Sequence, residues 1–336
     1  MYTFFYMSEA GDMGEPPVSR LRGDLVQRQQ SKEAKGSPSE RFHLATTVNT
    51  VGDEDGPPFS ASYQLDNTGN LKGSLTPRNG EMVSVLSVAD GLGGGASELH
   101  NGYGSTPRTG AYIAAREVQS IIPELIASDT GFLSASTADI KSRLEEALSQ
   151  RFRTMSERYP PTHGESRLKS DLINPLATTF STAILHETPE GTKVKVFWRG
   201  DSPVVIATPT ETYATETGTT GDAAMGREGS VNLSNQSLQA AEFTFPADTI
   251  VVFAASDGWF KRPGTDGIQR GVQDLIQALG EAVGSSDVQP RIKAKYVVGL
   301  VEPDDTTLAL ITNRNSPSEL HLIPPISIKP ITPLSI

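Results

Sequence analysis

The sequence predicts an α+β protein in which antiparallel sheets pack together and helices cover them from outside. Several short runs are rich in β-branched and aromatic residues, and three other stretches have a helical period. The strand-like runs follow one another without regular alternation with helices, which disfavours a doubly wound parallel sheet. With 36% hydrophobic and 21% charged residues over 336 positions, the chain can bury a sizeable core.

Five apolar runs are predicted to be strands. They are residues 82–90 (MVSVLSVAD), 181–185 (STAIL), 193–198 (KVKVFW), 243–257 (FTFPADTIVVFAASD) and 306–312 (TTLALIT). Their β-branched and aromatic side chains suit a pleated, buried surface. The first and fourth runs are almost continuously apolar just before an Asp-Gly pair. This is typical of strands that are buried on both faces and end at a rim where the chain turns.

Helices are predicted where apolar side chains recur every three or four residues. The stripes are Ile140, Leu144, Leu148, Phe152 and Met155 in the clearest helix, Ile113, Val118, Ile121 and Leu125 in an earlier one, and Val272, Leu275, Ile276, Leu279 and Val283 in a later one. The predicted order is a strand, two helices, a run of strands, two helices and a final strand.

The two ends of the chain differ from its middle. Residues 1–41 are too poor in apolar side chains to repay ordering, so we expect a disordered or weakly ordered extension. Residues 42–313 are predicted to form the folded domain. Residues 314–336 form a Pro-rich tail without a helical or strand period. Because the tail also carries Leu and Ile, a segment docked on the domain or on a partner is the alternative.

Composition excludes several classes of function. The net charge is −11 and no long basic run is present, so nucleic acid is not expected as a partner. The absence of cysteine excludes disulfides, thiolate zinc sites and thiol nucleophiles, and fits a reducing cytoplasm. No apolar run approaches the roughly 20 residues that cross a bilayer, and the first residues lack the features of a signal peptide. We therefore expect no membrane partner.

Aspartates recur at the ends of the predicted strands. Asp90 follows MVSVLSVA, Asp201 follows KVKVFWRG, Asp257 follows IVVFAAS, and Asp304-Asp305 precede TTLALIT. Carboxylates that lie close together repel one another, so several of them need a bound cation to make the arrangement stable. Oxygen ligands without Cys or clustered His select hard ions such as Mg²⁺, Mn²⁺ or Ca²⁺. Two such ions about 4 Å apart can activate a water and hold a phosphoryl group for in-line attack.

Each feature also has a simpler interpretation. A single strand-end aspartate is more often a turn former or a helix cap, and the glycine-rich loop at 91–95 is by itself a flexible turn. That loop is neither a P-loop nor a dinucleotide fingerprint. Four strand-end aspartates in one domain, two of them followed by Gly, nevertheless favour a metal site.

Taken in order, six short segments resemble the motifs of the type 2C metal-dependent protein phosphatases, the PPM family. They are Glu54-Asp55, ADGLGG (89–94), STA (181–183), RGDS (199–202), ASDG (255–258) and DDTT (304–307). The resemblance runs from about residue 43 to residue 312. It implies a four-layer α-β-β-α sandwich, with two packed antiparallel sheets flanked by helix pairs and a metal cluster at one end.

The resemblance also implies the site. It assigns metal-binding roles to seven positions, namely Asp90, Gly91, Asp257, Asp304, Glu54, Asp55 and Asp201. Asp90 would bridge two Mg²⁺ or Mn²⁺ ions, Asp257 and Asp304 would complete the shell of one, and Asp201 matches the position of a third ion in some members. Asp90, Asp257 and Asp304 would act in catalysis through a metal-bridging hydroxide, without a phosphoenzyme.

Several positions depart from the family pattern. Thr50 stands where many members carry a phosphate-binding Arg, and Leu92 stands where many carry a His. Phe180 and Pro203 replace a Gly and an Arg. Protonation of the leaving group then falls to a metal-bound water or to His100, which we expect instead to be an exposed loop histidine.

Two functions stay open at this point. The first is hydrolysis of phosphoserine or phosphothreonine in a phosphoprotein substrate, by a cytoplasmic monomer of bacterial type that opposes a Ser/Thr kinase. The second is a pseudophosphatase that acts as a protein-binding regulatory module, which Thr50, the neighbours of Asp201 and the long tails favour. A P-loop or kinase-like enzyme is excluded because its lysine is missing.

Overall fold

The computed structural model describes the parts of the chain that build the domain around the candidate site. The described residues are 4–5, 42–49, 55–64, 82–92, 98–129, 131–162, 176–188, 191–208, 210–215, 230–246, 250–260, 271, 307–314 and 328–335.

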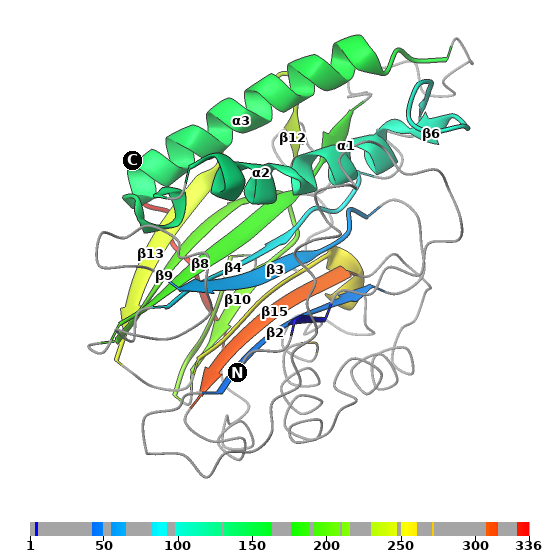
Figure 1. Ribbon diagram of the computed structural model, residues 1–336. Helices are drawn as coiled ribbons and strands as arrows, with labels where there is room; N and C mark the ends of the chain where they lie inside the picture. The colour runs from blue at the N-terminus through cyan, green and yellow to red at the C-terminus, as the bar shows by residue number, and fades with distance from the viewer. Residues whose placement is uncertain are drawn as a thin grey trace.

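Two sheets form the centre of the molecule (Figure 1). The five-stranded sheet has the order β13-β9-β8-β4-β3 and contains β13 (Gln239–Phe245), β9 (Gly191–Arg199), β8 (Phe180–Thr188), β4 (Met82–Val88) and β3 (Phe59–Gln64). The seven-stranded sheet has the order β1-β2-β15-β14-β10-β11-β16 and contains β1 (Phe4–Phe5), β2 (Phe42–Asn49), β15 (Thr307–Arg314), β14 (Ile250–Ala255), β10 (Val204–Ala207), β11 (Thr212–Ala214) and β16 (Ile328–Pro330). Two small ribbons pair β5 (Leu99–His100) with β6 (Arg108–Thr109), and β7 (Ala177–Thr178) with β12 (Val231–Asn232).

The two sheets share an apolar core between their facing surfaces. Leu86 and Val88 of β4 lie in this cluster together with Val252 of β14 and Ile311 of β15, and none of the four is exposed. The alternate residues Val83 and Val85 of β4 face the other way, into a second core under the helices. Burial on both faces explains the continuous apolar run that predicted this strand.

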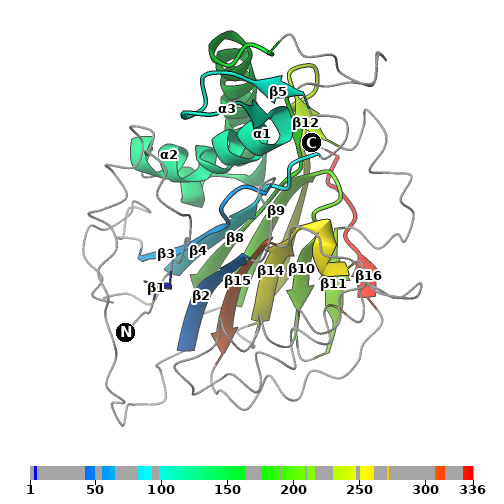
Figure 2. The same cartoon turned by 90° about the vertical axis from the view of Figure 1, so that its right-hand side faces the viewer.

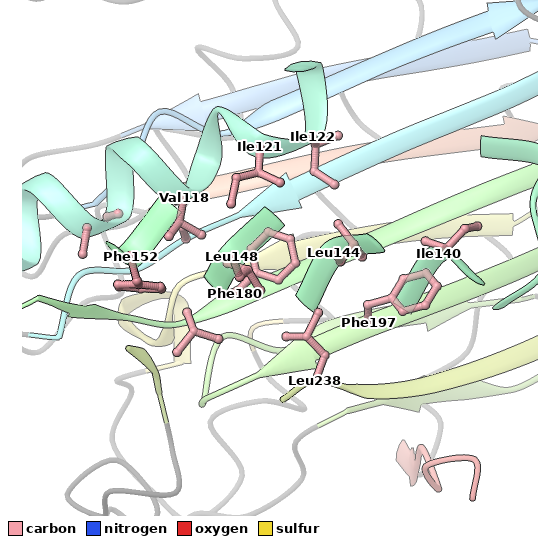
Figure 3. Packing of buried hydrophobic residues seen from close by; sticks show 14 of the residues in the cluster. Val118, Ile121, Ile122, Ile140, Leu144, Leu148, Phe152, Phe180, Phe197 and Leu238 are labelled. Carbon is pink, nitrogen blue, oxygen red and sulfur yellow. The ribbon is translucent and has the colours of Figure 1, made fainter. Parts of the chain in front are cut away.

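Three helices cover the outer face of the five-stranded sheet, namely α1 (Gly110–Gln119), α2 (Ile121–Ser128) and α3 (Thr137–Arg158) (Figure 2). The predicted stripe on α3 is buried along its whole length, from Ile140 to Met155. Leu144, Leu148 and Phe152 point towards Phe180 and Phe197 of the sheet in the helix-side core (Figure 3). Phe180, which stands where the family has a Gly, therefore fills this core.

The earlier predicted helix is two helices in the structure. Helix α1 ends at Gln119 and α2 begins at Ile121, with Ser120 between them. Pro123 has no N–H. In the first turn of α2 this is tolerated, whereas in one continuous helix the carbonyl oxygen of the preceding turn would lose its hydrogen bond. The periodicity of apolar residues is the same on both sides, which is why one helix was predicted.

The predicted strand at 243–257 is also two elements. Strand β13 ends at Phe245 and pairs with β9 in one sheet, while β14 begins at Ile250 and pairs with β10 and β15 in the other. Pro246 follows β13 directly and has no N–H for a ladder hydrogen bond. The other predicted strands are confirmed as β4, β8, β9 and β15. The helix predicted at 272–283 lies outside the described residues.

Parallel pairs occur at both outer edges of the seven-stranded sheet, where only antiparallel pairing was expected. Strand β1 pairs with β2, and β16 pairs with β11. After β16 the chain continues across the edge of the sandwich, because the N–H of Ile331 donates to Ala214 (2.8 Å) and the N–H of Leu334 donates to Ala240 of the other sheet (2.7 Å). The described part of the C-terminal tail is thus docked on the domain.

The α+β class is confirmed by two stacked, mainly antiparallel sheets with helices on an outer face. The described helices cover one of the two outer faces, so the four-layer sandwich stays a prediction. Among the described residues, no helix combines the length and apolar character needed to cross a membrane.

Candidate functional site

Four of the predicted acidic residues stand at strand ends in the structure. Asp90 lies two residues beyond β4, and Asp201 lies in the bend between β9 and β10. Asp257 opens the short 3₁₀ helix η3 (Asp257–Phe260) two residues beyond the end of β14, and Asp55 lies four residues before β3. We call these four residues the acidic cluster. Glu54, Asp304 and Asp305 lie outside the described residues.

The acidic cluster is brought together around Asp90. Oδ2 of Asp90 accepts a hydrogen bond from the backbone N–H of Asp257 (3.3 Å). Burial raises the pKa of the Asp90 carboxyl well above its ordinary value, and the negative charges of Asp55, Asp257 and Asp201 raise it further. The side chains of Asp55 and Asp90 are also hydrogen-bonded, which raises the pKa of Asp90 in the same direction. Carboxylates from four separate motifs therefore share one neighbourhood.

Asp55 is the most deeply buried of these acids, with 2% of its surface exposed. The hydroxyl of Thr307 donates to its Oδ2, and Nη1 of Arg116 donates to its backbone oxygen (2.8 Å). The next residue, Gly56, donates its N–H to Ala89 (2.9 Å), immediately before Asp90. These bonds tie Asp55 to helix α1, to β15 and to the end of β4.

The backbone at Asp90 is held by two threonines that precede β8. The N–H of Asp90 donates to Oγ1 of Thr179 (3.0 Å), and the carbonyl oxygen of Asp90 accepts from Oγ1 of Thr178 (2.6 Å) and from the N–H of Thr179 (2.8 Å). Gly91 forms a bridge with Thr178, and the N–H of Leu92 donates to Ala177 (3.2 Å). The turn that carries Asp90 is thus fixed before any ligand binds.

A set of buried hydroxyls links the strand ends beneath the acidic cluster, and sequence reasoning missed it. Its members are Thr178, Thr179, Ser181, Ser202, Ser256 and Thr307, each 3% exposed or less. Oγ of Ser202 is 2.6 Å from Oγ1 of Thr179, and the N–H of Thr307 donates to Oγ of Ser256 (2.9 Å). Ser202 and Ser256 directly adjoin Asp201 and Asp257 in the sequence, and this adjacency is the signal that could have revealed them.

The chemistry of the acidic cluster fits a hard divalent cation. All four side chains are carboxylates, which Mg²⁺ and Mn²⁺ prefer, and the repulsion that raises the pKa of Asp90 is what a bound cation would relieve. Within the described ranges alone, however, no three Asp, Glu or His side chains are arranged as a complete metal-binding group. The two-ion arrangement therefore stays a prediction that includes Glu54 and Asp304.

Two further residues have clear positions in the structure. His100 was expected to be an exposed loop histidine, and this is wrong, because it is 1% exposed and its Nδ1 lies 2.8 Å from the backbone oxygen of Tyr159. A carbonyl oxygen only accepts, so Nδ1 carries the proton and donates. Trp198, at the end of β9, is 5% exposed and packs in the core between the sheets.

Comparison with known proteins gives similarity at the level of structure. No protein-family model and no curated protein matches the sequence. The chain is similar to PppA, a regulatory component of the type VI secretion system in Pseudomonas aeruginosa, with 15% identity over 81% of this chain and 99% of that chain and a TM-score of 0.44. It is also similar to the S. agalactiae serine/threonine phosphatase, with 13% identity over 81% and 99% of the two chains and a TM-score of 0.44.

A third similar structure is the catalytic domain of the serine/threonine protein phosphatase PstP in complex with two manganese ions, with 14% identity over 76% and 98% of the two chains and a TM-score of 0.43. At such identities and TM-scores the similarities assign no activity to this chain. The solved structures similar to this chain include many serine/threonine phosphatases of the PP2C type.

Proposed function

We propose that this chain is a metal-dependent phosphatase that hydrolyses phosphoserine or phosphothreonine in proteins. One feature carries the proposal: Oδ2 of Asp90 accepts from the N–H of Asp257 at 3.3 Å, and the charges of Asp55, Asp257 and Asp201 raise the pKa of the Asp90 carboxyl. A protein that only needed turns at these strand ends would gain nothing from gathering negative charge at one point. A site for hard cations explains the gathering.

The residues that would hold Mg²⁺ or Mn²⁺ are those of the acidic cluster, with Gly91, Glu54 and Asp304. When bound, the ions would supply an activated water and positive charge opposite the phosphoryl group. Asp90 is suited to a central position because its carboxylate contacts both Asp55 and the N–H of Asp257. Its backbone is fixed on both sides by Thr178 and Thr179, so the carboxylate is oriented in advance.

Among the described residues, neither of the two side chains considered for this role can donate a proton to the leaving oxygen. Leu92 has no dissociable proton, and it packs beside Ala111 and Ala177. His100 is buried and uses Nδ1 on the backbone of Tyr159. We therefore assign neither side chain as a general acid, and solvent is the proton source in this proposal.

A pseudophosphatase that binds a partner protein without turnover is the second candidate. It is favoured by Thr50, which cannot supply the positive charge of an Arg, and by Pro203, which stands near Asp201 where the family often has an Arg. The two candidates differ in a measurable way, because only the phosphatase needs divalent cations for its activity.

The test is hydrolysis of p-nitrophenyl phosphate and of a phosphothreonine peptide with and without Mn²⁺. We expect Mn²⁺-dependent turnover that falls by more than about a hundredfold in Asp257→Ala, since even indirect partners of metal ligands cost 10–100-fold. Asp129→Asn, an exposed aspartate paired with Arg143, is the matched control and should keep its activity. A folded wild-type protein that neither binds Mn²⁺ nor turns over either substrate would contradict the phosphatase and support the binding module.

A further inference from the structure

Helix α1 lies directly against the chain segment that carries Asp55. Nη1 of Arg116 donates to the backbone oxygen of Asp55 at 2.8 Å. At the next residue, a Cβ added to Gly56 would meet the carbonyl oxygen of Ala115 at 2.5 Å, and that is closer than real Cβ contacts allow. The segment and the helix backbone are therefore in close contact, and Arg116 bonds to the segment at this point.

The guanidinium of Arg116 is itself held in place by an aromatic ring. It lies over the ring of Tyr112, with 3.6 Å from Cζ to the ring centroid, and Arg108 lies at 4.7 Å from the same centroid. Tyr112 is fixed in turn, because its N–H donates to the helix cap Thr109 (3.2 Å) and its ring packs edge-on against Tyr103. A planar guanidinium on an aromatic face has little freedom to move.

The same helix also contacts the strand that leads to Asp90. Nε2 of Gln119 donates to the backbone oxygen of Ser87 (2.7 Å), and Oγ of Ser87 is 3.4 Å from Oε1 of Gln119. Beyond Ser87, the carbonyl oxygen of Ala89 accepts the N–H of Gly56. Helix α1 thus joins the two acid-bearing segments, through Arg116 on one side and Gln119 on the other.

We propose that Arg116 is a positioning residue of the acidic cluster, which fixes Asp55 relative to Asp90 so that the pair can bind a divalent cation. The inference rests on the proposed function. Arg116 bonds to the backbone of Asp55 and leaves the carboxylate oxygens for the cation and for Thr307. Groups that orient metal ligands in this way usually contribute 10–100-fold to metal affinity.

The alternative is that Arg116 only fastens α1 to the domain. Arg151 provides the comparison, because it bonds to Glu117 of α1 and to Ser120 directly after it, and does not contact the acidic cluster among the described residues. Loss of either arginine should lower stability through α1. Only loss of Arg116 should also change the position of Asp55 and weaken metal binding.

The experiment uses the full chain and two measurements, namely Mn²⁺ binding by titration calorimetry and amide hydrogen exchange of residues 55–58. We expect Arg116→Gln to weaken Mn²⁺ binding by about tenfold or more and to speed exchange at Gly56. Arg116→Lys keeps the positive charge and can still donate a hydrogen bond, so it should recover part of the affinity. Arg151→Gln should lower the melting temperature, while its Mn²⁺ affinity stays within about twofold of wild type.

The possible outcomes separate the two proposals. If wild type binds Mn²⁺ and Arg116→Gln binds it equally well, this inference is overturned and the proposed function stands, whether or not exchange has changed. Equal loss of affinity in Arg116→Gln and Arg151→Gln would also overturn it, because α1 packing alone would then explain the effect. If wild type binds no Mn²⁺, the proposed function fails, and the role of Arg116 towards a cation fails with it.

Discussion

At the scale of single residues, the acidic cluster combines strong charge repulsion with tight local geometry. The charges of Asp55, Asp257 and Asp201 act on the carboxyl of Asp90, and the backbone N–H and carbonyl oxygen of Asp90 are bonded to Thr179 and Thr178. Asp55 is buried next to it and cannot move without breaking contacts to three elements. Because these contacts keep the carboxylates close together, their repulsion is relieved when a cation or a proton binds and not by movement of the side chains apart.

Asp90→Asn should remove a pH dependence from the stability of the metal-free protein. The pKa of Asp90 is raised in the folded state above its ordinary value of 3.8, so its ionisation destabilises the fold. The contribution of Asp90 to the free energy of unfolding should therefore fall as the pH rises from this value towards the folded-state pKa, by about 1.4 kcal/mol for each pH unit between the two. Urea unfolding in a chelator between pH 4 and 7 measures this fall.

In Asp90→Asn the fall should be smaller, and excess Mn²⁺ should reduce it in wild type. The same pH dependence of stability in wild type and in Asp90→Asn would show that the pKa of the Asp90 carboxyl is not raised in the folded protein.

Gly56→Ala tests the close approach of the Asp55 segment to α1. The new Cβ would meet the Ala115 carbonyl at 2.5 Å, so the segment must move away from the helix. We expect a loss of about 1–3 kcal/mol in the free energy of unfolding, as for other overpacked sites, and weaker Mn²⁺ binding. Gly131→Ala is the matched control, since its Cβ would meet only Oδ1 of Asp129 at 3.4 Å, an ordinary contact. Equal stability of the two variants would contradict the observed packing.

At the scale of elements, the three helices are joined by one arginine. Arg151 of α3 pairs with Glu117 of α1 at 2.8 Å and with Glu124 of α2, and its side chain is 19% exposed. Oη of Tyr159 also donates to Glu117 (2.9 Å), so this carboxylate has two partners. Because α1 and α2 are separate helices, the arginine fixes the angle at Ser120 as well as the packing of α3.

Arg151→Met should therefore cost more than the loss of an ordinary surface ion pair. Glu117, also 19% exposed, would keep its charge with one partner fewer, and we expect a loss of about 1–2 kcal/mol in the free energy of unfolding. The control is Arg143→Met, whose pair with Asp129 is 43% and 45% exposed and should change stability by less than about 0.5 kcal/mol. Chemical denaturation of both variants measures the difference. Equal losses in the free energy of unfolding would show that the ion pairs of Arg151 contribute no more than an ordinary surface pair.

At the scale of the whole molecule, the C-terminal segment joins the edges of the two sheets. Strand β16 extends the seven-stranded sheet, and Leu334 then bonds to β13 of the other sheet. Between them, Ile331 is 4% exposed and packs in the core between the sheets. An unpaired sheet edge invites association with other chains, so this segment protects an edge as well as closing the core.

Ile331→Ser should loosen this closure. Removing the buried side chain and introducing a hydroxyl should lower the free energy of unfolding by about 2–4 kcal/mol. Leu334→Ser, at a position that is 44% exposed, should change it by less than about 1 kcal/mol. Limited proteolysis followed by mass spectrometry should find cleavage near 328–335 much faster in Ile331→Ser. Equal protection in both variants would mean that Ile331 does not anchor the tail.

The parts of the fold that could be predicted are those with a local signal. The apolar run of β4 is buried on both faces, and the stripe of α3 is buried from Ile140 to Met155, as their patterns indicated. The break at Ser120 was missed because apolar periodicity continues across it. The separation of β13 from β14 was missed although Pro246 marks it in the sequence. His100 was misjudged for a related reason, since burial of a two-residue strand depends on distant residues such as Tyr159.

The sequence by itself determined that aspartates would end the buried strands, because strand burial and turn formation both depend on residues that are neighbours in the chain. Only the tertiary structure decided that Asp55, Asp90, Asp201 and Asp257 share one neighbourhood, and that Arg116, Thr179 and Thr307 support them. Strand pairing across a sheet and the approach of a helix to a loop join residues far apart in the chain. No pattern of neighbouring residues records such contacts, because they depend on the packing of the whole domain.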